Sequence, residues 1–161
     1  MLMLAEQPNA IFLGQNVEYD GNVVFKHLEG VPDDMRLEMP VAEELQTGIA
    51  IGLSLQGFLP ISIYPRMDFL LRAADQIVNH LDKLNPISNS QWNPKVILRT
   101  KVGATKPLNA GPQHTQDHTV AFQAMCKTIR VVPIRYSEEI LTVYEQAIER
   151  EGSTLIVEIL D

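Results

Sequence analysis

Short apolar runs alternate along the chain with longer segments in which apolar residues recur at helical spacing. The short runs predict six strands, at Ile11–Leu13, Arg36–Glu38, Pro60–Ile63, Val96–Leu98, Arg130–Val132 and Leu155–Glu158. The longer segments predict four helices, at Glu43–Leu55, Phe69–Leu84, Thr119–Lys127 and Ser137–Arg150. Four of the strands are apolar enough to be buried on both faces, as in a parallel sheet. The alternation predicts an α/β fold, a single domain with a mostly parallel sheet covered by helices on both faces.

Local signals mark the ends of two helices and two irregular segments. Gly57 is placed to stop the first helix, and Ser137, followed by acidic residues, is placed to start the last. Asn85–Pro94 is rich in Pro, Ser and Asn, which predicts a surface excursion. Lys101–Gln116 is predicted as a long loop at the carboxyl end of a strand, where binding groups concentrate in such sheets.

Length and composition favour one soluble domain over residues 1–161, with no linker. The net charge of −7 argues against a nucleic acid partner, and no apolar run reaches the length of a membrane span. The first residues lack the basic and apolar segments of a secretory signal, and the one cysteine, Cys126, cannot form an internal disulfide. We therefore expect a cytoplasmic protein, with Cys126 as buried filler.

Glu43 is the residue most suggestive of chemistry. It follows the predicted strand Arg36–Glu38 and opens a helix that is otherwise small and apolar. A carboxylate in this place can contact a ligand or partner at the carboxyl ends of a parallel sheet. It can equally be an ordinary acid in a first helical turn, favoured by the helix dipole. The residues alone leave both roles open.

Five motifs in one order resemble the pyrimidine-binding domain of thiamine-diphosphate enzymes, and above all the beta subunit of the first component of pyruvate and branched-chain 2-oxoacid dehydrogenases. They are Pro40-Val-Ala-Glu43, Gly48-Ile-Ala-Ile-Gly-Leu53, Gly57-Phe-Leu-Pro-Ile-Ser-Ile63, Asp75-Gln-Ile-Val-Asn79 and Gln113-His-Thr-Gln116. Gly14-Gln-Asn-Val-Glu-Tyr-Asp-Gly21 resembles the segment that precedes them in that family. The resemblance runs from about Ile11 to Leu160.

The resemblance implies two catalytic residues. Glu43 falls on the family's glutamate, which contacts a ring nitrogen of the cofactor's aminopyrimidine and favours its imino tautomer. Neighbouring Glu44 competes for this role, but the motif register favours Glu43. His114 falls on the family's active-site histidine, which helps to orient the 2-oxo substrate. His118, four residues further on, is the competing candidate.

The segment Tyr64–Phe69 stands where the family places an aromatic side chain against the pyrimidine ring. Tyr64, Arg66 and Phe69 are therefore implied to bind the cofactor. Bacterial relatives often carry an aromatic residue where Arg66 stands, and a guanidinium can also lie flat on a heteroaromatic ring. Arg66 could instead bind a carboxylate or phosphate of the substrate. The alternative to all three roles is that Tyr64 and Phe69 are core residues and Arg66 faces solvent.

The sequence departs from the pattern of the resembled family in two further ways, at Gln15 and in the motif that binds the diphosphate. The family usually has an acid where Gln15 stands, so an acid relay between two active sites is in doubt. The sequence contains no Gly-Asp-Gly motif, with which the family holds its diphosphate and Mg²⁺, and it stops at Asp161, where dehydrogenase beta subunits continue into a C-terminal domain. The resemblance thus implies that a larger partner subunit supplies the diphosphate and Mg²⁺ sites.

The leading hypothesis is a pyrimidine-binding subunit that shares thiamine diphosphate with this partner, self-associates through its helices and is inactive alone. The implied reaction is decarboxylation of a small 2-oxo acid, or acyl or ketol transfer. The alternatives are a non-catalytic structural or regulatory module of the same fold, and an unrelated α/β binder of small molecules.

Overall fold

The computed structural model describes residues 1–107 and 109–159. Leu108, in the predicted loop, and residues 160–161, at the end of the predicted domain, lie outside the described residues. Six strands form one sheet in the order β2-β1-β3-β4-β6-β5, and all five neighbouring pairs are parallel. Their bounds are β1 Ala10–Gly14, β2 Arg36–Glu38, β3 Leu59–Ile63, β4 Ile97–Lys101, β5 Arg130–Ile134 and β6 Thr154–Glu158. All six predicted strands are confirmed.

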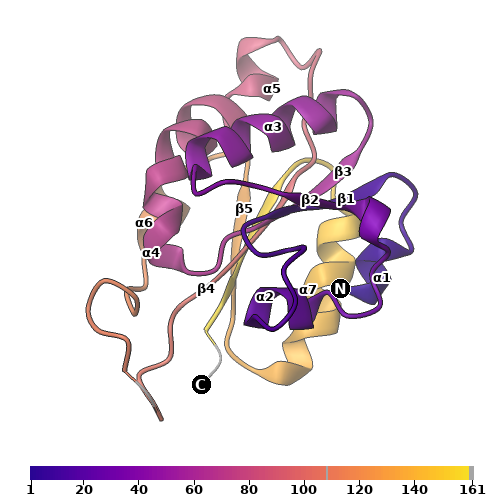
Figure 1. Cartoon of the computed structure of the whole chain (residues 1–161). Coiled ribbons are helices and arrows are strands. Elements are labelled where there is room, and N and C mark those ends of the chain that lie inside the picture. Colours follow the sequence, from indigo (N-terminus) through magenta and orange to yellow (C-terminus); the bar gives the residue numbers. More distant parts are fainter. Residues whose placement is uncertain (108, 160–161) are drawn as a thin grey trace.

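Helices cover both faces of this sheet, as predicted (Figure 1). One face carries α3 (Glu43–Leu55), α4 (Met67–Leu70) and α6 (Thr119–Met125), and the other carries α1 (Leu2–Ala5), α2 (Val23–His27) and α7 (Ile140–Glu149). Two apolar cores result, because alternate side chains of each strand point to opposite faces. Leu13, Leu98 and Leu155 pack under α3, whereas Phe12, Ile97 and Ile156 pack under α7.

The α3 helix has the predicted bounds, and Gly57 follows its end with a φ of +87°, a conformation that suits glycine. Ser137 begins a short 3₁₀ turn, Ser137–Glu139, which leads into α7. Cys126 is buried in the core under α3, as predicted. No helix among the described residues is long and apolar enough to cross a membrane.

The prediction of one continuous helix over Phe69–Leu84 is wrong. The chain forms a succession of short pieces instead: α4 Met67–Leu70, a 3₁₀ turn Leu71–Ala73, a π-helix Gln76–Leu81 and α5 Leu84–Ile87. In the π-helical piece the N–H of Asp82 donates to the carbonyl of Ile77, five residues back. The wider turn brings the Asp82 carboxylate to the backbone N–H groups of residues 127–129.

Candidate functional site

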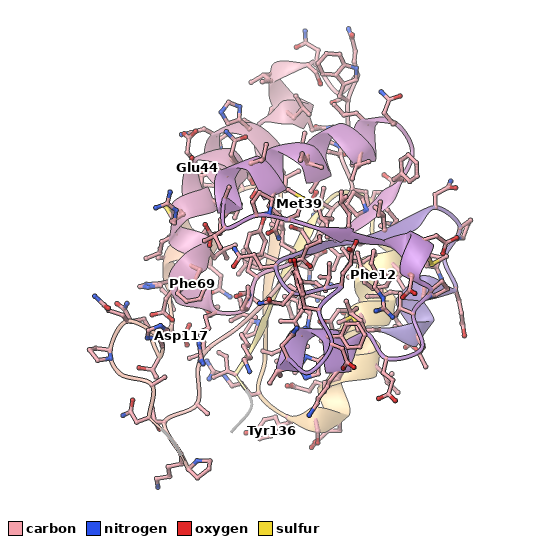
Figure 2. All side chains as sticks on the ribbon, viewed as in Figure 1. Phe12, Met39, Glu44, Phe69, Asp117 and Tyr136 are labelled. Carbon is pink, nitrogen blue, oxygen red and sulfur yellow. The ribbon has the colours of Figure 1, made fainter. Side chains whose placement is uncertain are left out.

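Glu43 is the first residue of α3, five residues after the end of β2 at the carboxyl edge of the sheet. Its side chain is buried, with only 2% of the residue exposed. Glu44 is exposed on the outer side of the same turn (Figure 2), because adjacent helical residues point about 100° apart. The structure therefore separates the two candidate acids, and only Glu43 is sequestered from water.

The Glu43 carboxylate is only partly satisfied. The Gln15 side chain donates from Nε2 to Oε1 over 3.2 Å. The Nε of Arg72 lies 3.4 Å from Oε2, within ion-pair distance, but Arg72 itself is 67% exposed. The Oε2 atom is buried and has no hydrogen-bond partner among the described residues. Since a buried carboxylate oxygen without a hydrogen bond is costly, this oxygen is suited to a donor from a ligand.

A chain of buried hydrogen bonds fixes the first turn of α3 against β3. The Thr47 hydroxyl donates to the Glu43 carbonyl over 2.8 Å and therefore accepts from the Tyr64 phenol at 2.6 Å. Ser62 donates to Tyr64, and Gln46 donates to Ser62. Burial raises the pKa of Tyr64 to about 12, against the opposing effect of the hydrogen bonds to Ser62 and Thr47, so the phenol stays protonated. These hydrogen bonds thus fix the backbone of Glu43 to the sheet.

Tyr64 lies in the hydrophobic core. It is 1% exposed, and its phenol belongs to the hydrogen-bonded chain under α3. This position matches the core alternative that the sequence left open for Tyr64. Phe69 and Arg66 are both partly exposed and remain the residues of the segment that can face a ligand.

The loop after β4 brings His114 to these two residues. It leaves the end of the strand and reaches away from the body of the domain (Figure 1). The His114 ring meets Phe69 edge to face, with 5.7 Å between ring centroids, and the His114 carbonyl accepts from Arg66 at 3.4 Å. Gln116 donates to Asp68 on α4 at 3.0 Å. Figure 2 shows Phe69 and Asp117 on the same side of the molecule, where loop and helix meet.

Gly103 permits this arrangement by a close approach of backbones. It is buried, and a Cβ atom there would lie 1.9 Å from the His114 carbonyl oxygen and 2.5 Å from Nη1 of Arg66. His118 lies where α6 begins, and its N–H donates to the Met67 sulfur. Its Nε2 is buried and has no hydrogen-bond partner in the part of the chain that the structure describes. Both histidines are therefore ordered by α4.

Glu43 and His114 are not in direct contact among the described residues. Glu43 follows β2 and the His114 loop follows β4, which are three strand positions apart in the sheet. Neighbouring strands are spaced by about 4.8 Å, so the two strand ends are roughly 14 Å apart.

Some residues near Glu43 escaped the sequence analysis. Gln15 stood out as a missing acid, but its contact with Glu43 was not predicted. Arg72 and Thr47 were not singled out; Thr47, one turn after Glu43, could have been found from the i, i+4 spacing. No group of three or more His, Cys, Asp and Glu side chains within residues 1–107 and 109–159 could hold a metal ion.

A parallel sheet with an acid at the start of the helix after β2, and a histidine in the loop after β4, is the arrangement expected of a pyrimidine-binding domain. The chain belongs to this family: residues 2–159 match the model of the transketolase pyrimidine-binding domain. Relatives in this family are subunits of thiamine-diphosphate-dependent enzymes.

Among its relatives are beta subunits of the pyruvate dehydrogenase E1 component. The chain is 34% identical over 125 residues to the subunit of Cyanidium caldarium. This match covers 76% of the present chain and 38% of the relative. It is 28% identical over 160 residues to the mitochondrial beta-1 subunit of Oryza sativa subsp. japonica, covering 96% of this chain and 41% of the relative. The chain therefore spans about two fifths of these curated relatives.

A solved structure described as a split-gene transketolase, in the form of an inactive β4 tetramer, has the same fold. It superposes with a TM-score of 0.70 at 19% identity, over 94% of this chain and 45% of the solved chain. The predicted fold class and family resemblance are thereby confirmed.

Proposed function

We propose that the chain is the pyrimidine-binding part of a multi-chain thiamine-diphosphate enzyme that acts on a 2-oxo acid or a ketose. The reaction would be decarboxylation, or acyl or ketol transfer. One observation carries the proposal: Glu43 holds a buried carboxylate oxygen, Oε2, that makes no hydrogen bond within the described residues, although the exposed Arg72 lies at ion-pair distance. A protonated ring nitrogen is a donor of the size and polarity that this oxygen requires.

The residues present fit the pyrimidine half of the cofactor. Glu43 would hold a proton between Oε2 and a ring nitrogen, with Gln15 fixing the second oxygen by its 3.2 Å hydrogen bond. Phe69 offers an aromatic face for contact with the ring. When bound, thiamine diphosphate supplies an acidic thiazolium carbon that attacks the 2-oxo group.

His114 would serve the substrate. It lies in the loop after β4, with its ring against Phe69 and its backbone fixed by Arg66. An imidazole in this place can donate a hydrogen bond to a developing alkoxide or move a proton near neutral pH. Since Glu43 and His114 follow strands roughly 14 Å apart, they would act on different parts of the bound reactants.

We infer that a second, larger subunit holds the diphosphate and Mg²⁺. The sequence has no Gly-Asp-Gly motif, and the described residues have no acidic or histidine cluster fit for a metal. The α3 helix offers a surface for assembly: a Cβ at Gly52 would meet nothing within 4 Å, and one at Gly48 would meet only Gln76, at 3.9 Å. Another helix can approach closely there, as self-association requires.

The test is to co-express the chain with a subunit that carries the Gly-Asp-Gly motif. We expect weak cofactor binding by the chain alone, and in the complex tight binding together with rapid hydrogen–deuterium exchange at the thiazolium carbon. Calorimetry measures the binding, and NMR measures the exchange without knowledge of the substrate. Micromolar or tighter binding by the isolated chain would contradict the shared site.

A non-catalytic module of the same fold is the second candidate. The charge around Glu43 favours it, because Arg72 lies within ion-pair distance of the carboxylate that catalysis requires. The split-gene transketolase of the same fold is itself described as an inactive β4 tetramer. A stable complex that binds cofactor but exchanges its thiazolium proton no faster than free cofactor would establish this second role.

A further inference from the structure

A small basic pocket lies beside the candidate active site, at the carboxyl ends of β3 and β4. Its volume is about 140 Å³, and α2 closes its far wall through Val23, Val24 and His27. Three cationic side chains line it, those of Arg66, Arg99 and Lys101. We call this hollow the basic pocket.

The charges of the basic pocket are not balanced by the protein. Arg99 forms a two-pronged ion pair with Glu158, at 2.8 and 2.7 Å. Neither Arg66 nor Lys101 has a carboxylate within ion-pair distance in the part of the chain that the structure describes. The single hydrogen bond found for the Arg66 side chain goes to the neutral carbonyl of His114. Three cations thus face one carboxylate, in a chain whose net charge is −7.

Holding these cations together works against folding. Burial lowers the pKa of Lys101, and the charges of Arg66 and Arg99 lower it further. Like charges brought together in a partly dry hollow repel one another, and a ligand of opposite charge removes this repulsion. Concentrated charge of one sign in a cleft is a feature of ligand sites, because it attracts and holds a counter-ion.

The size of the basic pocket limits what can bind. Sites for whole small molecules have volumes of about 300–1,000 Å³, so a hollow of 140 Å³ holds a single group rather than a nucleotide or cofactor. The arginine fork and the lysine ammonium match the oxygens of a carboxylate or phosphate. Arg66 also touches the His114 loop, so the rest of such a ligand would extend toward the candidate active site.

We propose that the basic pocket binds the second anionic group of the substrate, a carboxylate or phosphate at the end remote from the 2-oxo group. Lys101 and Arg66 are the residues that bind it, and Arg99 adds charge from the wall. The substrate would then be a dicarboxylic or phosphorylated 2-oxo compound rather than a simple 2-oxo acid. This assignment rests on the proposed function for the identity of the ligand, but not for the existence of the anion site.

The anion site is testable on the full chain without cofactor or partner. Inorganic phosphate and succinate are titrated separately and followed by NMR, which distinguishes the two anion chemistries. We expect binding of at least one of them, weakened at least about tenfold by Lys101→Met and by Arg66→Met. The methionine keeps the apolar stem and removes the charge. Lys127→Met is the matched control and should bind as wild type, because Lys127 is exposed beside α6 and does not line the pocket.

Circular dichroism is used to test whether each variant is folded. If a methionine variant does not fold, the charge reversal Lys101→Glu is used in its place. Absence of binding to wild type, or equal binding by the Lys101 and Lys127 variants, would overturn the anion site. Loss of phosphate binding when the partner subunit is added without cofactor would overturn the substrate assignment, because a partner side chain then fills the pocket. A failed thiazolium exchange test leaves the titration unchanged, so the two proposals fail separately.

Discussion

Two carboxylates at the carboxyl edge of the sheet, the buried Glu43 and the largely buried Glu158, differ in how their charge is balanced. Glu158, at the end of β6, accepts from Arg99 on both oxygens and from the Tyr144 hydroxyl at 2.9 Å. Burial alone would raise the pKa of Glu158, but its hydrogen bond and ion pair with Arg99 lower it instead. Glu43, on the other face of the sheet, has one hydrogen bond, from Gln15, and a distant ion pair with an exposed arginine.

The difference separates a structural charge from a functional one. A fully satisfied ion pair holds two elements together and loses stability when either partner is removed. An incompletely satisfied carboxylate costs stability in the free protein, and this cost is recovered when a donor arrives. We therefore expect Glu158 to stabilise the fold and Glu43 to bind a ligand.

Replacing Glu43 by Gln tests the functional side and has the largest expected effect. In the assembled enzyme we expect hydrogen–deuterium exchange at the thiazolium carbon to slow by about a hundred- to ten-thousand-fold, the range for loss of acid–base catalysis. This corresponds to roughly 3–5 kcal/mol of barrier. Stability in urea should be unchanged or slightly higher, since an incompletely paired buried charge is removed.

Glu44→Gln is the internal control for this experiment. Glu44 is exposed one residue away, so its variant should exchange at nearly the wild-type rate. If the Glu44 variant is the slower of the two, the assigned register is wrong.

Glu158→Gln tests the structural side. It leaves Arg99, whose side chain is 9% exposed, without its counter-charge, and we expect a loss of about 3–5 kcal/mol in the free energy of unfolding. The double variant Arg99→Met/Glu158→Gln should recover much of this loss, because no charge is then left unpaired. Urea unfolding followed by circular dichroism measures both. A Glu158 variant as stable as the wild type would remove the contrast with Glu43.

Asp82 is a second well-satisfied carboxylate, and its contribution to stability depends on pH. Burial would raise its pKa, but the Lys83 ammonium and the N–H groups of Ile129, Thr128 and Lys127 lower it to about 2. The contribution of Asp82 to the free energy of unfolding is therefore complete above the pKa of about 3.9 that an aspartate has in the unfolded chain. It is lost as the pH falls through about 2. Asp82→Asn should cost about 3 kcal/mol at pH 7, given about 1.5–3 kcal/mol for each charged hydrogen bond.

The variant should also lose less stability than the wild type between pH 4 and pH 2. Thermal unfolding across a pH series measures this difference. Parallel acid profiles for the two proteins would show that Asp82 carries no linked proton.

Tyr64→Phe is expected to have the smallest effect. The ring stays, so no cavity forms, but Thr47 loses its donor and Ser62 its acceptor. We expect a loss of about 1–2 kcal/mol, as for an unmade buried hydrogen bond. Thiazolium exchange should fall only a few-fold, because Glu43 keeps its own contacts. A loss as large as that of Glu43→Gln would mean that the phenol takes part in the chemistry.

Much of the fold follows from periodicity in the sequence. The strands are apolar runs of three to five residues between turn signals, and α3 carries an unbroken helical pattern that ends before Gly57. The helices α1 and α2, of four and five residues, are too short to show a period and were not predicted. The π-helix at Gln76–Leu81 was also missed, because apolar spacing does not distinguish an i+5 turn from an i+4 turn.

The candidate site was predictable only in part. Glu43 and His114 were found through the order of motifs, and the structure adds burial of the first and a packed loop for the second. Tyr64 was placed at the cofactor because an aromatic residue was expected there, yet its hydroxyl joins a polar chain inside the core. Such contacts join residues from different elements, and no local pattern encodes them.

The absence of a side chain at Gly103 has a consequence for how this protein can diversify. An added methyl group would collide with the loop backbone at His114 and with the tip of Arg66, not with a core residue. The His114 backbone and the Arg66 side chain would have to shift together to admit it. A substitution at Gly103 would therefore disturb the His114 loop and Arg66 at the same time. We expect substrate range to change more readily by substitution of neighbouring residues than by substitution of Gly103 itself.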